Sequence, residues 1–159
     1  ALLGGVAGHA GLFANAADVA RLATPLARRG LYGKKQYIAA ETITLFTSPQ
    51  LVNNRRGLLW DRPETTRGKA SPVGPLASAY SFGHSGFTGT LLWIDPQTDL
   101  TFIFLSNRVH PSATPNRLAE LNVRTQLLDE ALRLVKHVSL QQPLPSKVTA
   151  AKMTDASKD

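Results

Sequence analysis

Two apolar runs joined by a short polar segment constrain the fold more than any other part of this 159-residue chain. The runs are residues 90–94 and 100–105, and the segment between them, residues 95–99, consists of turn-forming types. Runs rich in β-branched and aromatic residues on both sides of such a turn are typical of an antiparallel hairpin. The second run is apolar at nearly every position, which predicts burial on both faces and makes it the expected most buried strand.

The stretch before the hairpin, residues 80–90, carries Gly83, Gly86 and Gly89 at intervals of three among aromatic and β-branched residues. Glycine inside a strand usually marks a bulge or a close approach by another backbone or a ligand. We therefore expect an edge strand beside a pocket, which completes a three-stranded meander over about 78–106. A bulged structural strand without a ligand is the competing interpretation.

Helices are predicted on both sides of this meander. Asn15 as an N-cap, Asp18 at the third helical position and Gly30 as a stop predict an amphipathic helix of about three turns. A second, short helix is expected at 40–46. Thr114 as N-cap and Pro115 at the first helical position predict a third helix that runs to about 137 and covers one face of the sheet. The expected fold class is α+β, an antiparallel sheet covered by a C-terminal helix.

Between these elements the sequence favours loops. Residues 48–78 are rich in Pro and Gly, with one short strand expected at 57–60, so this segment is a candidate wall or lid of a site. His9 lies among glycines and is expected to be buried or to line a site, with a hydrogen-bonded structural histidine as the alternative. Residues 1–138 are expected to be one part of a domain, and residues 139–159 a flexible polar tail.

Composition excludes several classes of function. The chain has 18 Lys+Arg against 11 Asp+Glu, a formal net charge of +7, but the basic residues fall in small loop groups such as Arg55-Arg56. We interpret them as solvated surface, with no nucleic-acid partner. The absence of cysteine excludes disulfides and thiolate sites, and four scattered histidines predict no metal or other cofactor. No apolar run is long enough to span a membrane.

Four sequence blocks together resemble a known family. They are residues 5–13 (Gly-Val-Ala-Gly-His-Ala-Gly-Leu-Phe), 82–90 (Phe-Gly-His-Ser-Gly-Phe-Thr-Gly-Thr), 93–96 (Trp-Ile-Asp-Pro) and 105–108 (Leu-Ser-Asn-Arg). In this order they resemble the C-terminal half of the serine β-lactamase and penicillin-binding-protein family, in its class C and esterase-like branch, over roughly residues 4–136. The resemblance implies part of an α/β sandwich, with the first two helices belonging to an adjoining helical part.

The resemblance also implies roles for four consecutive residues. The family's Lys-Thr-Gly or His-Ser/Thr-Gly triplet falls on His84, Ser85 and Gly86. His84 would assist proton transfer, Ser85 would bind the substrate carboxylate, and Gly86 would let the substrate backbone lie against the strand. Phe87 would supply a backbone N–H to the oxyanion hole.

One departure from the family pattern is central: the chain contains no Ser-x-x-Lys and no Tyr-x-Asn or Ser-x-Asn element. We expect both in a missing N-terminal half of the same domain, so this chain alone should be inactive. The strand at 100–105 is expected to pair with a strand of that half, and its open edge should favour self-association.

As an intact protein, the favoured function is an acyl-enzyme serine hydrolase of the D-alanyl-D-alanine carboxypeptidase type. Its ligands would be peptidoglycan peptides or β-lactams, and its location periplasmic or otherwise extracytoplasmic, with membrane association through a missing N-terminal segment left open. A serine esterase or β-lactamase of the same family, and a non-catalytic binding module, remain the alternatives.

Overall fold

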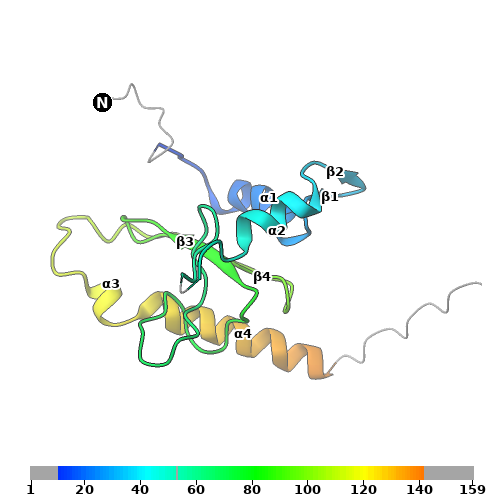
Figure 1. Ribbon diagram of the computed structural model, residues 1–159. Helices are drawn as coiled ribbons and strands as arrows, with labels where there is room; N and C mark the ends of the chain where they lie inside the picture. The colour runs from blue at the N-terminus through cyan, green and yellow to red at the C-terminus, as the bar shows by residue number, and fades with distance from the viewer. Residues whose placement is uncertain (1–10, 53, 142–159) are drawn as a thin grey trace, which may run out of the picture.

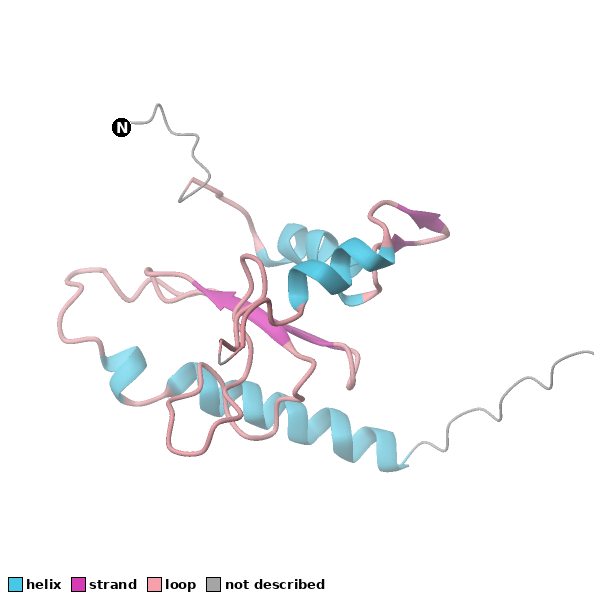
Figure 2. Cartoon of the chain, in the orientation of Figure 1, coloured by secondary structure: helices cyan, strands magenta, loops and turns pink. Residues whose placement is uncertain are grey.

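The computed structural model describes residues 11–52 and 54–141, and within them it contains four helices and two antiparallel sheets. The α+β class expected from the sequence is therefore observed. Figures 1 and 2 show a central sheet with helices on either side of it and a long irregular segment folded around one end. The elements, in chain order, are α1 (Ala16–Ala27), β1 (Leu31–Tyr32), β2 (Lys35–Gln36), α2 (Ala40–Thr47), β3 (Phe82–Ser85), β4 (Leu91–Asp95), β5 (Leu100–Phe104), α3 (Arg117–Glu120) and α4 (Val123–Gln141).

The predicted meander is present as the sheet β3-β4-β5, with antiparallel pairing throughout. Its register pairs Phe82 with Ile94, and Trp93 with Phe102. The expectation that the last strand is the most buried is wrong. β5 is only half-buried at all its positions, whereas four of the five residues of β4 are buried. Among the described residues β5 pairs with β4 alone. Its apolar sequence is explained by its contacts with α1 and with α4.

One face of the sheet is covered by α4. Leu91 and Trp93 of β4 form a buried cluster with Leu128 and Leu132 of the helix, and Val73 of the long loop joins them. These two strand residues are separated by one position and therefore point to the same face. Burial of five large or medium apolar side chains in one cluster makes this interface a main source of stability.

The opposite face is covered by α1. Phe82 and Ile94, which are cross-strand partners, form a buried cluster with Ala23 of the helix, and Trp60 contacts Phe82 edge-on with ring centroids 5.3 Å apart. The expectation that α1 belongs to a separate helical part therefore needs correction. Ala23 is fully buried because the helix packs directly on the sheet, so α1 and the strands form one layered unit.

The first two helices form where the sequence predicts them. The Asn15 side chain accepts a hydrogen bond from the backbone N–H of Asp18 at 3.0 Å, which satisfies one of the unpaired donors of the first turn. Gly30 follows the helix with a φ of 91°, in the left-handed region that favours glycine. α2 covers Ala40–Thr47, one residue longer than expected.

The start of the last helix differs from the prediction. Thr114 and Pro115 lie in a loop, and Asn116 caps a single turn, α3, by accepting a hydrogen bond from the Ala119 N–H. Asn122, with a φ of 50°, then interrupts the helix before α4 begins at Val123. An asparagine tolerates the left-handed conformation better than most residues, which explains a break here that apolar periodicity did not reveal.

The segment between α2 and β3 is irregular where described, as expected, but its predicted strand at 57–60 is wrong. Leu59 has a φ of 68°, and the Gly57 N–H donates to the Trp60 carbonyl at 3.0 Å, so these residues form a turn. α4 continues to Gln141, past the tail boundary expected at 138. The predictions for His9 and for residues 142–159 fall outside the described residues.

Candidate functional site at the end of strand β3

On the edge of β3 that faces away from β4, the backbone pairs with another described backbone segment at Gly83 but not at Ser85. The Gly83 N–H donates to the Asp61 carbonyl at 3.0 Å, and the Gly83 carbonyl accepts from the Asp61 N–H at 2.8 Å. Hydrogen-bonding direction alternates along a strand, so the backbone N–H and C=O of Ser85 also point away from β4. Within the described residues no backbone group donates to or accepts from these outward groups of Ser85. The strand thus presents one free pairing position.

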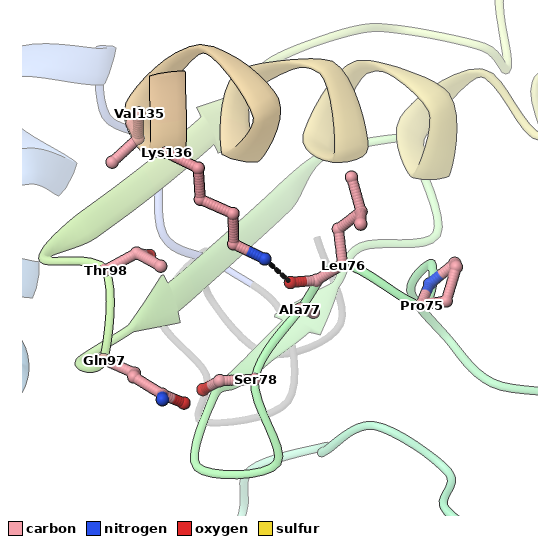
Figure 3. Close-up of a pocket in the computed structure, with 8 residues that line it drawn as sticks. All are labelled: Pro75, Leu76, Ala77, Ser78, Gln97, Thr98, Val135 and Lys136. Atoms are coloured by element: carbon pink, nitrogen blue, oxygen red, sulfur yellow. Dashed lines mark hydrogen bonds between the residues drawn. The ribbon is translucent and has the colours of Figure 1, made fainter. Parts of the chain in front are cut away.

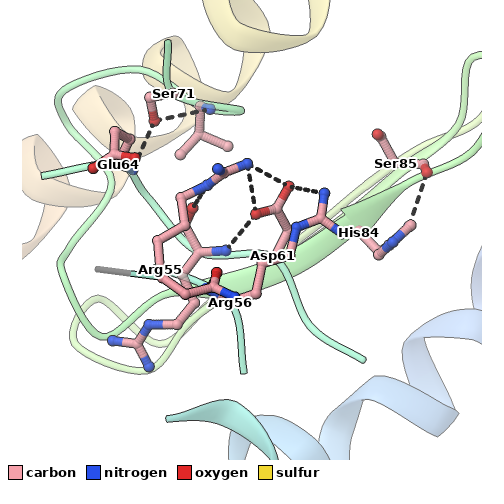
Figure 4. A network of polar contacts seen from close by, with 10 residues as sticks. Arg55, Arg56, Asp61, Glu64, Ser71, His84 and Ser85 are labelled. Carbon is pink, nitrogen blue, oxygen red and sulfur yellow. Dashed lines mark hydrogen bonds and ion pairs between the residues drawn. The ribbon is translucent and has the colours of Figure 1, made fainter. Parts of the chain in front are cut away.

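The His84 side chain lies at this free position. Its Nδ1 is 2.9 Å from the Ser85 carbonyl oxygen, and both residues are exposed (Figure 4). A carbonyl oxygen can only accept, so this contact is a hydrogen bond only when Nδ1 carries the proton. In the neutral ring Nε2 is then unprotonated and able to take a proton. A bond to the Ser85 carbonyl therefore makes Nε2, rather than Nδ1, the nitrogen of the neutral ring that can accept a proton.

A small hollow adjoins His84. It has a volume of about 240 Å³ and is lined by Leu12, Ala14, Val19, His84, Thr90, Leu91, Leu92, Ile103 and Leu105. Apart from His84 and Thr90 its walls are apolar, and they come from α1, the segment before it, and β4 and β5. Ligand pockets usually enclose about 300–1,000 Å³, so this hollow is large enough for one small apolar group.

Gly86 and Phe87 begin the turn that connects β3 to β4. The Gly86 N–H donates to the Thr90 carbonyl at 2.9 Å, and this bond marks the last rung of the β3–β4 ladder. Phe87 follows with a side chain that is 74% exposed. The four residues named from the sequence, His84, Ser85, Gly86 and Phe87, therefore lie together at one exposed end of the sheet.

An ion-pair network fixes the loop that closes the other part of the β3 edge. Asp61 has a side chain only 13% exposed and lies 3.0 Å from the guanidinium of Arg55 and 3.6 Å from that of Arg56 (Figure 4). Its carboxylate also accepts a hydrogen bond from the Arg62 N–H at 2.9 Å. Because this residue exchanges backbone bonds with Gly83, the network holds residues 55–62 against β3.

The interpretation of the basic groups as solvated surface is wrong for Arg55, because its side chain is only 28% exposed and forms the ion pair. Arg62 is also half-buried, donates to the carbonyls of Thr47 and Ala79, and its pKa is lowered by burial. The sequence does contain a signal, because Asp61 follows Arg55 by six residues within a long loop, and an ion pair between them would order that loop. Only the fold reveals that this loop contacts the site strand.

A larger cavity lies elsewhere among the described residues. It has a volume of about 660 Å³ and is bounded by the loop at 75–78, the β4–β5 turn and the C-terminal half of α4 (Figure 3). Lys136 lies in its wall and donates to the Leu76 carbonyl at 3.3 Å. None of the four residues named from the sequence lines it. We therefore place the candidate site at the end of β3 on chemical grounds, despite the smaller hollow there.

Within residues 11–52 and 54–141, no group of three or more histidine, cysteine or carboxylate side chains is placed to hold a metal ion. Over the same residues, no helix has the length and apolar character needed to cross a membrane.

Comparison with known proteins identifies the family to which this chain belongs. A family model described as beta-lactamase matches residues 1–156. The chain belongs to the β-lactamase family. This membership confirms the resemblance drawn from the four sequence blocks, and it places the chain in a family of serine hydrolases. No solved structure matches the chain.

Curated relatives of this β-lactamase-family chain carry carboxypeptidase and amidase names. A protein of Escherichia coli (strain K12) named "Putative D-alanyl-D-alanine carboxypeptidase" is 40% identical over 116 residues, which cover 72% of this chain and 26% of the relative. A Salmonella agona protein of the same name is 38% identical over 114 residues, or 71% and 26% of the two chains. A Bacillus subtilis protein named "N-acetylmuramyl-L-alanine amidase" is 37% identical over 117 residues, or 70% and 26%. The aligned part of the chain thus spans about a quarter of each of these relatives.

Proposed function

We propose that this chain supplies the substrate-binding strand of a serine hydrolase that acts through an acyl-enzyme on peptides ending in D-Ala-D-Ala or on β-lactams. The observation that carries the proposal is the free pairing position at Ser85 beside His84, whose Nδ1 contacts the Ser85 carbonyl at 2.9 Å. An extended peptide can add to such an edge through main-chain hydrogen bonds. A histidine with an unprotonated Nε2 then lies beside the bound peptide.

Each of the four site residues has a role consistent with its position. Ser85 offers its backbone to the substrate and its hydroxyl to the substrate carboxylate. Gly86 has no side chain to obstruct the ligand at the strand end. The Phe87 N–H would donate to the oxyanion that develops as the carbonyl is attacked, an interaction worth about 3–4 kcal/mol in comparable sites. His84 would take or return a proton through Nε2.

The nucleophile of this reaction would come from a segment other than residues 1–159. Covalent catalysis needs an activated hydroxyl with a base in hydrogen-bond reach, and no serine of this chain has a lysine three residues later. The curated relatives have ample additional sequence for such a segment, since the alignment covers 26% of each. The free edge of β5, which pairs only with β4 among the described residues, is where we propose that a strand of this segment joins the sheet.

The substrate class is inferred from the relatives and from charge. Two of the reported relatives carry the name "Putative D-alanyl-D-alanine carboxypeptidase" and one the name "N-acetylmuramyl-L-alanine amidase", and we take these names as the guide to the substrate. A net charge of +7 favours association with an anionic polymer such as a cell wall. We therefore propose that the protein acts outside the cytoplasm on peptidoglycan peptides.

Replacing His84 by Ala in the full-length protein tests the proposal. We expect kcat/KM for release of D-alanine from a D-Ala-D-Ala peptide to fall by about 100-fold, because a positioned proton-transfer group contributes at least this much. His137→Ala is the matched control, since this exposed histidine lies near the end of α4 and not on β3.

Thermal unfolding of both variants separates catalysis from folding. An unchanged kcat/KM in a folded His84→Ala protein would remove this residue from the mechanism. Hydrolysis of short esters without release of D-alanine would instead favour the esterase alternative for the same site.

A further inference from the structure

The turn that carries Phe87 has little rigidity of its own. It spans residues 86–90 and contains two glycines, of which Gly89 has a φ of 108°. Its internal backbone bonds run from the Gly86 N–H to the Thr90 carbonyl at 2.9 Å and from the Gly89 N–H to the Gly86 carbonyl at 3.0 Å. The second bond holds the peptide plane that contains the Gly86 carbonyl and the Phe87 N–H, but it comes from another residue of the same two-glycine turn. An oxyanion donor must be held within about 0.5 Å of its working position, so contacts from outside the turn would add to this single internal bond.

Arg108 makes such contacts in two ways. Its guanidinium carbon lies 4.5 Å from the centroid of the Phe87 ring, within the range of a cation–π interaction. Its backbone N–H also donates to the Thr88 carbonyl at 2.9 Å. Arg108, in the segment that follows β5, therefore contacts the turn at two neighbouring residues. Its side chain contacts Phe87, and its backbone contacts Thr88.

Arg108 is itself anchored on the far side. Its Nη1 donates to the Ala113 carbonyl at 3.0 Å. Within the described part of the chain its guanidinium forms no ion pair with a carboxylate. The guanidinium of Arg108 therefore contacts the Phe87 ring and the Ala113 carbonyl, and its positive charge is not neutralised by an ion pair there.

A second arginine supports the other end of the turn. Nη1 of Arg124 donates to the Thr90 carbonyl at 3.3 Å. Burial lowers the pKa of Arg124, and the positive charge of Arg108 lowers it further. Two guanidinium groups near each other raise the electrostatic potential around the turn, which favours a negative charge developing close to it.

We propose that Arg108 is a positioning residue that holds the Phe87 peptide so that its N–H faces the oxyanion. The inference rests on the proposed acyl-enzyme function and adds to it a residue outside the His-Ser-Gly strand. Loss of an oxyanion donor lowers rate constants by about 100- to 1,000-fold. A donor that is retained but loosened should lose part of this, so we expect the acylation rate constant to fall by about 10- to 100-fold in Arg108→Met.

Three variants test the role. Arg108→Met removes the cation and its bond to Ala113 but keeps an extended apolar side chain. Arg108→Lys keeps a cation over the ring and should restore most of the effect. Arg133→Met is the matched control, because this arginine is 64% exposed and its ion pair with Glu130 lies on α4.

The first measurement is amide hydrogen exchange at Gly89 in the chain itself, which requires no nucleophile. The Gly89 N–H is bonded within the turn, so its exchange reports opening of the turn. We expect exchange at least tenfold faster in Arg108→Met, unchanged in Arg133→Met, and unchanged over Leu91–Asp95 in both. The second measurement is acylation of the full-length variants by a fluorescent penicillin. The acylation rate constant should fall, while the dissociation constant for initial binding of the penicillin stays within about twofold. A variant that was only less stable would not show a selective loss of the acylation rate constant.

The outcomes separate this proposal from the function on which it rests. Unchanged exchange at Gly89 in Arg108→Met overturns the positioning contact, whatever the activity. Faster exchange with an unchanged acylation rate constant also overturns it, because the turn then opens without consequence for the reaction. A wild-type full-length protein that accepts no acyl group overturns the proposed function and, with it, the catalytic part of this inference.

Discussion

Replacing Gly83 by alanine should separate the structural glycine of β3 from the glycine proposed to face substrate. A β-carbon at Gly83 would lie 2.2 Å from the Leu92 carbonyl oxygen and 2.3 Å from Cε3 of Trp93. Neither neighbour can withdraw, since the carbonyl belongs to the adjacent strand and Trp93 is 1% exposed. Overpacking of a filled core costs about 1–3 kcal/mol. With two immovable contacts, we expect Gly83→Ala to lower the free energy of unfolding by about 3 kcal/mol.

Gly86→Ala is the matched control on the same segment. Its β-carbon would come within 2.3 Å of the Thr90 hydroxyl and no closer than 3.6 Å to any other atom. A hydroxyl can move by rotation of its side chain, so we expect a change within about 0.5 kcal/mol, partly offset by the lower entropy of the unfolded chain. Urea unfolding followed by tryptophan fluorescence measures both values. Equal losses in the two variants, or a Gly83→Ala protein as stable as wild type, would refute the packing argument.

Two further predictions concern the face of α4 that packs on the sheet and the order of the strands within the sheet. Leu132→Ala should lower the free energy of unfolding by about 2–5 kcal/mol, because this side chain is fully buried against β4. Leu134→Ala, at a position 60% exposed on the same helix, should change it by less than about 0.5 kcal/mol, and similar losses would contradict the assigned helix face. Amide exchange should be slowest in Leu91–Asp95, the central strand, and faster in Leu100–Phe104. The reverse order would show that β5 is paired on both sides.

The sequence predicted the elements whose signals are local. The hairpin followed from two apolar runs and a turn, and α1 from the Asn15 cap, which accepts its expected bond from Asp18. The strand β3 was expected for a similar reason, because three glycines and the triplet His84-Ser85-Gly86 occur within a few positions. The roles assigned to this triplet stay a prediction.

The sequence could not predict features that depend on tertiary neighbours. Near-continuous hydrophobicity predicted that β5 is the most buried strand, but β4 lies between β3 and β5 and is buried more fully. The left-handed conformations of Leu59 and Asn122 turned an expected strand into a turn and divided an expected helix. The contact between Asp61 and Gly83 joins residues 22 positions apart, and no local pattern indicates it.

The most direct test of the central claim is mass spectrometry after exposure to penicillin, performed on residues 1–159 and on the full-length protein in parallel. The chain holds the strand proposed to bind substrate, but none of its serines is followed three residues later by the lysine that would activate a nucleophile. We therefore expect no covalent adduct on the isolated chain, and one acyl group per molecule of full-length protein, on a serine outside residues 1–159. A stoichiometric adduct on any serine of the isolated chain would contradict this division of the site.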